Sequence, residues 1–133
     1  MKIIVDTDVW SEALRRPPVE ASPERLILAD LIQDNQVQMI GCIRQEILQG
    51  LRDQAQFERL RSAILVFPDR MVFSSEYELA ATFYNTCRRN GIQGSGTDFL
   101  IAACSVTWGL PILTKDKDFA RYAKHLPLKL VGV

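Results

Sequence analysis

The chain has 133 residues, 47% of them hydrophobic, and its 16 lysines and arginines balance 16 aspartates and glutamates. This length suits a single domain, residues 1–133, with a core built from about two-thirds of the unfolded surface. The neutral total excludes nucleic-acid binding driven by overall charge, so such binding requires an uneven distribution of basic residues. No apolar run approaches the roughly 20 residues of a membrane span and no signal-peptide pattern is present, so we expect a cytoplasmic protein with no membrane partner.

Sites built from cysteine or histidine are disfavoured. Cys42, Cys87 and Cys104 show no CxxC spacing, and we expect buried free thiols rather than zinc ligands. His125 is the only histidine, which leaves almost nothing for a histidine-ligated metal or a Ser-His-Asp triad. The carboxylates are therefore the residues to search for a site.

Apolar periodicity predicts strands and helices that alternate along the chain. Strands are expected at residues 3–5, 37–40, 110–113 and 128–131, and helices at 8–16, 23–34, 42–51, 55–65, 76–89, 99–108 and 119–124. Residues 66–73 stay uncertain, because Pro68 and Asp69 interrupt a short apolar run. Strands separated by helices, without hairpin signals, indicate a three-layer α/β domain whose mostly parallel central sheet is flanked by helices.

Four acidic residues occupy positions at which such a domain would gather them. Asp6 follows the first strand, and Glu46 lies in the helix after the second strand. Asp98 opens the most apolar helix, and Asp116 follows the strand that ends at Leu113. Ligands of open parallel sheets bind at the carboxyl ends of the strands. These four residues are the candidate site.

Each acid also has a simpler interpretation as a residue of local structure. Asp6 suits a turn, Asp98 suits a capping box with Ser95, and Asp116 suits a helix cap. Glu46 is harder to explain in this way, because it lies beside the buried stripe of its helix. Independent caps would scatter, whereas three of the four acids fall where parallel strands end.

Converging carboxylates raise one another's pKa unless a cation neutralises them. Mg²⁺ and Mn²⁺ prefer carboxylate and water oxygens, whereas zinc lacks its usual ligands in this sequence. A carboxylate-bound Mg²⁺ that retains water suits in-line displacement at a phosphodiester. A basic rim could grip the backbone phosphates, drawn from Arg15, Arg16, Arg44, Arg52, Arg88, Arg89, Lys115 and Lys117.

Four segments, IIVDTDVW, IRQEILQGL, GSGTDFLIAA and ILTKDKDFA, resemble the four acidic motifs of PIN-domain ribonucleases in order and spacing. The likeness is specifically to the small VapC-type toxins of toxin-antitoxin pairs. It implies a three-layer PIN-like domain, Mg²⁺- or Mn²⁺-dependent cleavage of single-stranded or loop RNA, a homodimer, and inhibition by a cognate antitoxin. The helices at 42–51 and 55–65 match the helical clip of the family, an antitoxin or dimer surface.

The resemblance assigns the catalytic and metal-binding acids to Asp6, Glu46, Asp98 and Asp116, with Thr7 and Thr114 at small hydroxyl positions beside them. Asp118 could share or take the fourth role, although Asp116 is nearer the strand end. We expect Asp6, Asp98 and Asp116 to hold the metal, while Glu46 orients the attacking water or joins a second ion. Asp8 is expected to be a first-turn acid of the following helix.

Two alternatives stay open. Asp6-Thr7-Asp8 and Thr114 imitate a haloacid-dehalogenase phosphatase, in which Asp6 is the nucleophile and Asp8 the general acid. That class also needs a later strand with further acids, which is missing, and gives Glu46 no role. The second alternative is a catalytically silent domain that binds RNA or a protein partner.

Overall fold

In the part of the chain that the structure describes, three short parallel strands form the centre of the fold. β1 (Ile3–Val5) lies between β2 (Val37–Gln38) and β3 (Ile112–Leu113) and runs parallel to both. In this computed structural model, which describes residues 1–15 and 20–132, Ile4 and Val5 of β1 are completely buried. A central parallel strand is covered on both faces, which explains why β1 is a continuous apolar run.

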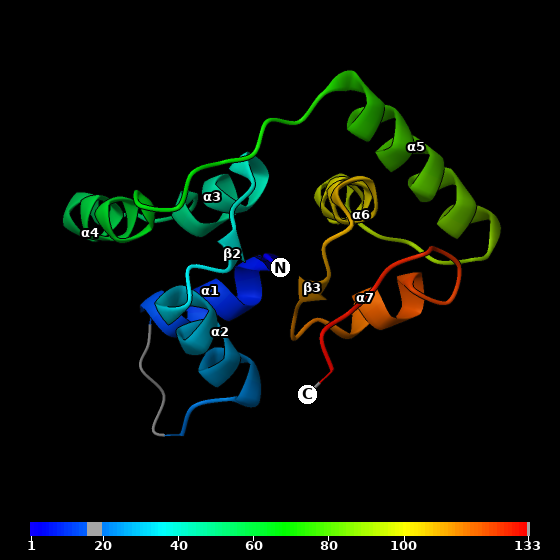
Figure 1. Cartoon of the computed structure of the whole chain (residues 1–133). Helices are drawn as coiled ribbons and strands as arrows, with labels where there is room; N and C mark the ends of the chain where they lie inside the picture. The colour runs from blue at the N-terminus through cyan, green and yellow to red at the C-terminus, as the bar shows by residue number, and fades with distance from the viewer. Residues whose placement is uncertain (16–19, 133) are drawn as a thin grey trace.

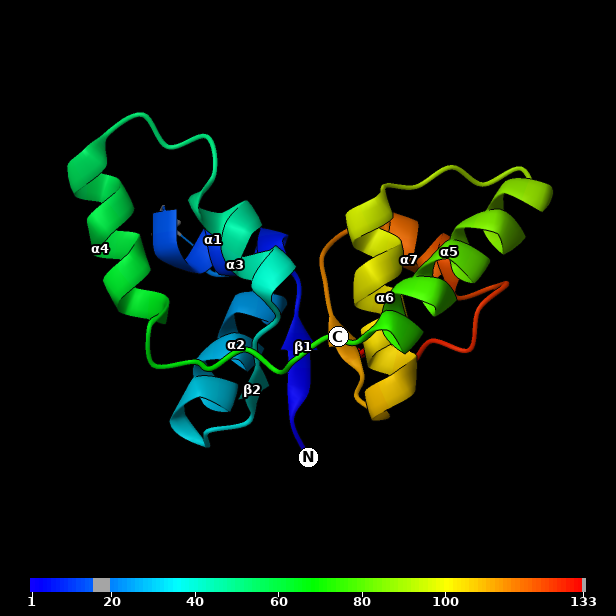
Figure 2. The same ribbon diagram turned by 90° about the horizontal axis from the view of Figure 1, so that it is seen from above.

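Helices flank the sheet on two sides. The seven found in the described ranges are α1 (Thr7–Arg15), α2 (Pro23–Gln33), α3 (Gly41–Leu48), α4 (Gln54–Ile64), α5 (Ser74–Arg89), α6 (Gly96–Trp108) and α7 (Lys117–Tyr122). Figure 1 and Figure 2 show α1 to α4 on one side of β1 and α5 to α7 on the other. The prediction of a three-layer α/β domain with a parallel sheet flanked by helices is confirmed.

The most apolar helix, α6, forms the core of its side of the sheet. Phe99 and residues 101–105 are buried, and α5 packs against α6, which Figure 1 shows end-on. The hydroxyl of Ser95 accepts a hydrogen bond from the Asp98 N–H at 3.1 Å, as expected of an N-cap. Gly109 ends the helix at φ +67°. These caps place Asp98 in the first helical turn.

The predicted strand at 128–131 is wrong in extent. The backbone there forms only an isolated parallel bridge between Leu130 and Ile112, with the Ile112 N–H donating to the Lys129 carbonyl. β2 is also shorter than the predicted 37–40, and its neighbour Met39 forms a single bridge to Asp69 in the segment that stayed uncertain.

Several helix ends also differ from the predictions. The helix predicted to reach residue 51 ends at Leu48, because Gln49 is extended and Gly50 takes a φ of +80°. α7 begins at Lys117 rather than residue 119, since Asp116 serves as its N-cap. Residue 16, the predicted end of the first helix, lies outside the described residues.

The cysteines are free, as predicted. Cys87 and Cys104 are buried and Cys42 is half-buried. None of the helices described is long and apolar enough to cross a membrane. The assignment of residues 1–133 to one domain stays a prediction.

Candidate active site

Asp6 lies directly after β1 and is 6% exposed. Its Oδ1 accepts a hydrogen bond from the Thr7 N–H, and its Oδ2 accepts one from the Thr114 hydroxyl, both at 2.8 Å. The pKa of Asp6 is raised from its ordinary 3.8 to about 7, chiefly by burial and also by the charges of Asp8 and Asp98, although the two hydrogen bonds lower it. Asp6 is therefore a buried acid whose charge is disfavoured by its surroundings.

Glu46 and Asp98 face the same region from α3 and α6. The Thr7 hydroxyl donates to Glu46 Oε1 at 2.8 Å, and the Tyr122 hydroxyl donates to Asp98 Oδ2 at 2.8 Å. Burial is the largest cause that raises the pKa of Asp98, and the charges of Asp116 and Glu46 also raise it. Two helices that are remote in sequence thus bring their carboxylates into electrostatic contact.

Asp116 is linked to Asp6 through one threonine. The Thr114 hydroxyl oxygen accepts from the Asp116 N–H at 3.0 Å and donates its own proton to Asp6. Asp116 Oδ1 accepts from the Asp118 N–H at 2.8 Å, as expected of the α7 cap, whereas the Asp118 carboxylate pairs with Arg121 on the same helix. Of the two candidates for the fourth acid, Asp116 is the one in the network of Asp6.

The four acids are therefore gathered, and each accepts a hydrogen bond from a neighbouring N–H or hydroxyl. Within residues 1–15 and 20–132, however, no three His, Cys, Asp or Glu side chains lie in a preformed metal-binding group. The donor set itself, carboxylates without histidine or thiolate ligands, suits a hard divalent cation.

Comparison with known proteins decides the family. The model of the PIN domain matches residues 3–125. The chain belongs to the PIN-domain family. This assignment replaces the haloacid-dehalogenase alternative. No curated protein matches the sequence.

Solved structures similar to this PIN domain are distant in sequence. VapBC2 from Rickettsia felis, bound to a promoter DNA fragment, superposes with a TM-score of 0.79 at 14% identity, covering 98% of each chain. FitAcB from Neisseria gonorrhoeae gives 0.74 at 17% identity, covering 98% of this chain and 96% of the other. VapBC-1 from nontypeable Haemophilus influenzae gives 0.74 at 15% identity, with 98% and 97% covered. At these identities the likeness shows the fold.

Two residues expected at a basic rim form ion pairs with acidic residues of this PIN domain. Lys115 Nζ pairs with Glu12 at 2.9 Å, and its N–H donates to Asp8 Oδ2 at 3.1 Å. Arg44 pairs with Asp69 at 2.9 Å. Arg16 lies outside the described residues. The contacts of Lys115 tie the turn that carries Asp116 to α1.

Sequence reasoning missed Glu12 and Tyr122. Hydrogen bonds from Ser22 and Lys115 lower the pKa of Glu12 to about 2, so it is a fully charged anchor for the turn after β3. The sequence signal for Glu12 was its spacing from Asp8, because the two residues are four apart and share a face of α1. As predicted, Asp8 lies in the first turn of that helix.

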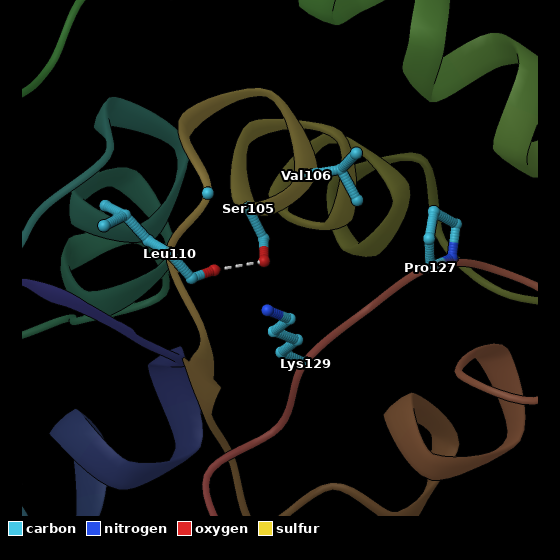
Figure 3. Close-up of a pocket in the computed structure, with 6 residues that line it drawn as sticks. Ser105, Val106, Leu110, Pro127 and Lys129 are labelled. Atoms are coloured by element: carbon cyan, nitrogen blue, oxygen red, sulfur yellow. Dashed lines mark hydrogen bonds between the residues drawn. The ribbon is translucent and has the colours of Figure 1, made fainter.

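A cavity of about 220 Å³ lies at the other end of α6 and contains none of the candidate acids. Figure 3 shows Lys129 extending toward Ser105, whose hydroxyl donates to the Leu110 carbonyl. The carboxylates gather instead at the end of α6 that carries Asp98. The two features are therefore separate.

Proposed function

We propose that this PIN domain is a metal-dependent endoribonuclease that acts as the VapC-type toxin of a toxin-antitoxin pair. PIN domains are generally nucleases and typically use divalent metals. The observation that carries the proposal is Asp6, which is buried among other carboxylates with its pKa raised to about 7. Such an arrangement costs folding free energy unless a cation compensates the charges.

Asp6, Asp98 and Asp116 would hold Mg²⁺ or Mn²⁺. When bound, the ion lowers the pKa of a water molecule and stabilises the negative charge that develops on the phosphodiester. Thr114 orients two of these ligands at once, because it donates to Asp6 and accepts from the Asp116 N–H. Thr114 would therefore hold the Asp6 carboxylate and the backbone of Asp116 next to each other.

Glu46 orients the attacking water or joins a second ion. The Thr7 hydroxyl holds Oε1 of Glu46, and we assign Oε2 to the water. Glu46 reaches the site from α3, on the opposite side of β1 from Asp98 on α6 (Figure 2). A substrate phosphate between the two helices would meet the water from one side and the metal ligands from the other.

The partners we propose are a single-stranded or looped RNA, a cognate antitoxin and a second copy of the chain, all in the cytoplasm. The solved structures similar to the chain include toxin-antitoxin complexes. Just beyond α4, Leu65 and Val66 are 64% and 75% exposed. Exposed apolar side chains at the end of the helical pair α3 and α4 suit a protein partner.

The proposal is tested by RNA cleavage with Mn²⁺ or Mg²⁺, with EDTA as the metal-free reference. Asp6→Asn and Asp98→Asn should abolish cleavage while the circular dichroism spectrum is unchanged. Asp30→Asn, which removes an exposed acid from α2, is the matched control and should cleave normally. Full activity in either site variant contradicts the assignment.

Two further comparisons define the site and the substrate. Asp116→Asn should lose far more activity than Asp118→Asn, and the reverse order would move the fourth acid to Asp118. Sequencing RNA 5′ ends after controlled expression should reveal one discrete cut site. Absence of cleavage at high enzyme concentration with Mn²⁺ would instead favour the catalytically silent alternative.

A further inference from the structure

Tyr122 is a buried tyrosine whose hydroxyl reaches the candidate site. The residue lies at the end of α7, is completely buried, and donates to Asp98 Oδ2 at 2.8 Å. Its ring packs against Phe99 and Phe119, with centroids 4.9 and 5.3 Å away. Packing on two sides holds the ring, so the direction of the hydroxyl is set by the core.

Gly94 provides the space that this hydroxyl occupies. A Cβ at position 94 would lie 2.3 Å from the Tyr122 hydroxyl oxygen, 2.8 Å from its Cζ and 2.9 Å from Phe99 Cε2. Real Cβ atoms essentially never approach other atoms this closely, so any larger residue would displace the Tyr122 ring. A Cβ built on Gly96, two residues later, would meet no atom within 4 Å.

Asp98 is held differently from the other acids. Asp6, Glu46 and Asp116 receive their hydrogen bonds from N–H groups or threonine hydroxyls next to the site. Asp98 accepts, besides a hydrogen bond with the Ser95 side chain, one from the hydroxyl of a buried aromatic residue. The core therefore controls the orientation of this carboxylate.

We propose that Tyr122 is a positioning residue for Asp98, and that Gly94 is required for it to act. By donating to Oδ2, the hydroxyl restricts rotation of the carboxylate that would bind the divalent cation. This inference rests on the proposed function, since it assumes that Asp98 binds metal. Removing a hydrogen-bond partner of a metal ligand typically lowers metal affinity or activity by about 10- to 100-fold.

Titration calorimetry with MnCl₂ in the absence of RNA provides the direct test. Tyr122→Phe keeps the ring and removes only the hydroxyl, so Mn²⁺ should bind about 10- to 100-fold more weakly. Tyr84→Phe is the matched control, because Tyr84 packs edge-on against the same Phe99 at 5.7 Å but is 38% exposed. Its Mn²⁺ affinity should equal that of the wild type.

A second pair of variants tests the role of the space. Gly94→Ala retains the hydroxyl but displaces it and should weaken Mn²⁺ binding as Tyr122→Phe does, whereas Gly96→Ala should not. Melting curves in EDTA identify any variant that fails to fold. If Tyr122→Phe or Gly94→Ala fails to fold, the inference is decided by the Mn²⁺ affinity of the other variant and its control. A folded Tyr122→Phe protein with wild-type Mn²⁺ affinity overturns the inference alone. A wild-type protein that binds no Mn²⁺ overturns both the inference and the proposed function.

Discussion

Replacing Asp6 with asparagine should stabilise the metal-free protein at pH 8 even though it abolishes activity. The pKa of Asp6 is raised from 3.8 to about 7 in the folded chain, mainly by burial. Between these values the folded carboxyl holds a proton that the unfolded carboxyl has lost. The unfolded state then binds fewer protons, so the stability of the wild type falls as the pH rises from about 4 to about 7. Asparagine is neutral throughout and avoids this loss.

The size of the effect follows from the same values. Each pH unit in the window lowers the stability of the wild type by about 1.4 kcal/mol, so the advantage of Asp6→Asn should grow by about 3 kcal/mol between pH 5 and pH 8. Asparagine keeps an acceptor for the Thr7 N–H but changes the bond with the Thr114 hydroxyl, a cost of about 1 kcal/mol at either pH. For a domain of this size the pH-dependent difference corresponds to about 10 °C in melting temperature.

Thermal or urea unfolding in EDTA at pH 5 and pH 8 measures the effect, with Asp30→Asn as the control for loss of one exposed acid. Mn²⁺ at 100 times its Kd should cancel most of this advantage, because it stabilises the protein that binds it by about 2.7 kcal/mol. Equal stability of Asp6→Asn and wild type at pH 8, or a difference that is the same at both pH values, would refute the reasoning.

Three further predictions concern the same region. The Mn²⁺ affinity of the wild type should increase as the pH rises toward about 7, with proton release near pH 6.5, because Asp6 must lose its proton to bind the ion. Calorimetry in buffers of different ionisation enthalpy measures the released proton, and pH-independent binding would contradict the raised pKa of Asp6. Thr114→Val should lower Mn²⁺ affinity about 10- to 100-fold, since it frees both Asp6 and the Asp116 N–H; an unchanged affinity would show that this bridge is dispensable. Ser22→Ala should destabilise the chain by about 1 kcal/mol in urea unfolding through loss of the α2 cap, and no loss would mean that water replaces it.

The places of Asp6 and Asp98 in the fold could be predicted from the sequence, because each lies beside a local signal. β1 is a short apolar run that stops at Asp6, and Ser95 marks the start of α6 three residues before Asp98. These signals involve neighbours in the chain and do not depend on distant packing. The extent of the 128–131 strand does depend on pairing with Ile112, and only one bridge forms there.

The donors that hold the acids were harder to predict. Tyr122 follows Phe119 at helical spacing and has the pattern of a core residue, which it also is. No sequence signal near Tyr122 indicates that its hydroxyl reaches Asp98. This contact depends on the space left by Gly94, which lies in the loop before α6. Lys115 is similar, because its pairing with Glu12 spans 103 residues. A cation in such a long-range pair cannot be told from a free one by sequence pattern.

The short segment from Thr114 to Tyr122 also determines when the site can form during synthesis. It carries Asp116 together with the donors that hold Asp6 and Asp98, and it leaves the ribosome after both of those acids. Until it emerges and folds against β1 and α6, Asp6 lacks its hydrogen bond from Thr114 and Asp98 lacks its hydrogen bond from Tyr122. A chain still being translated through α6 therefore has an incomplete candidate site.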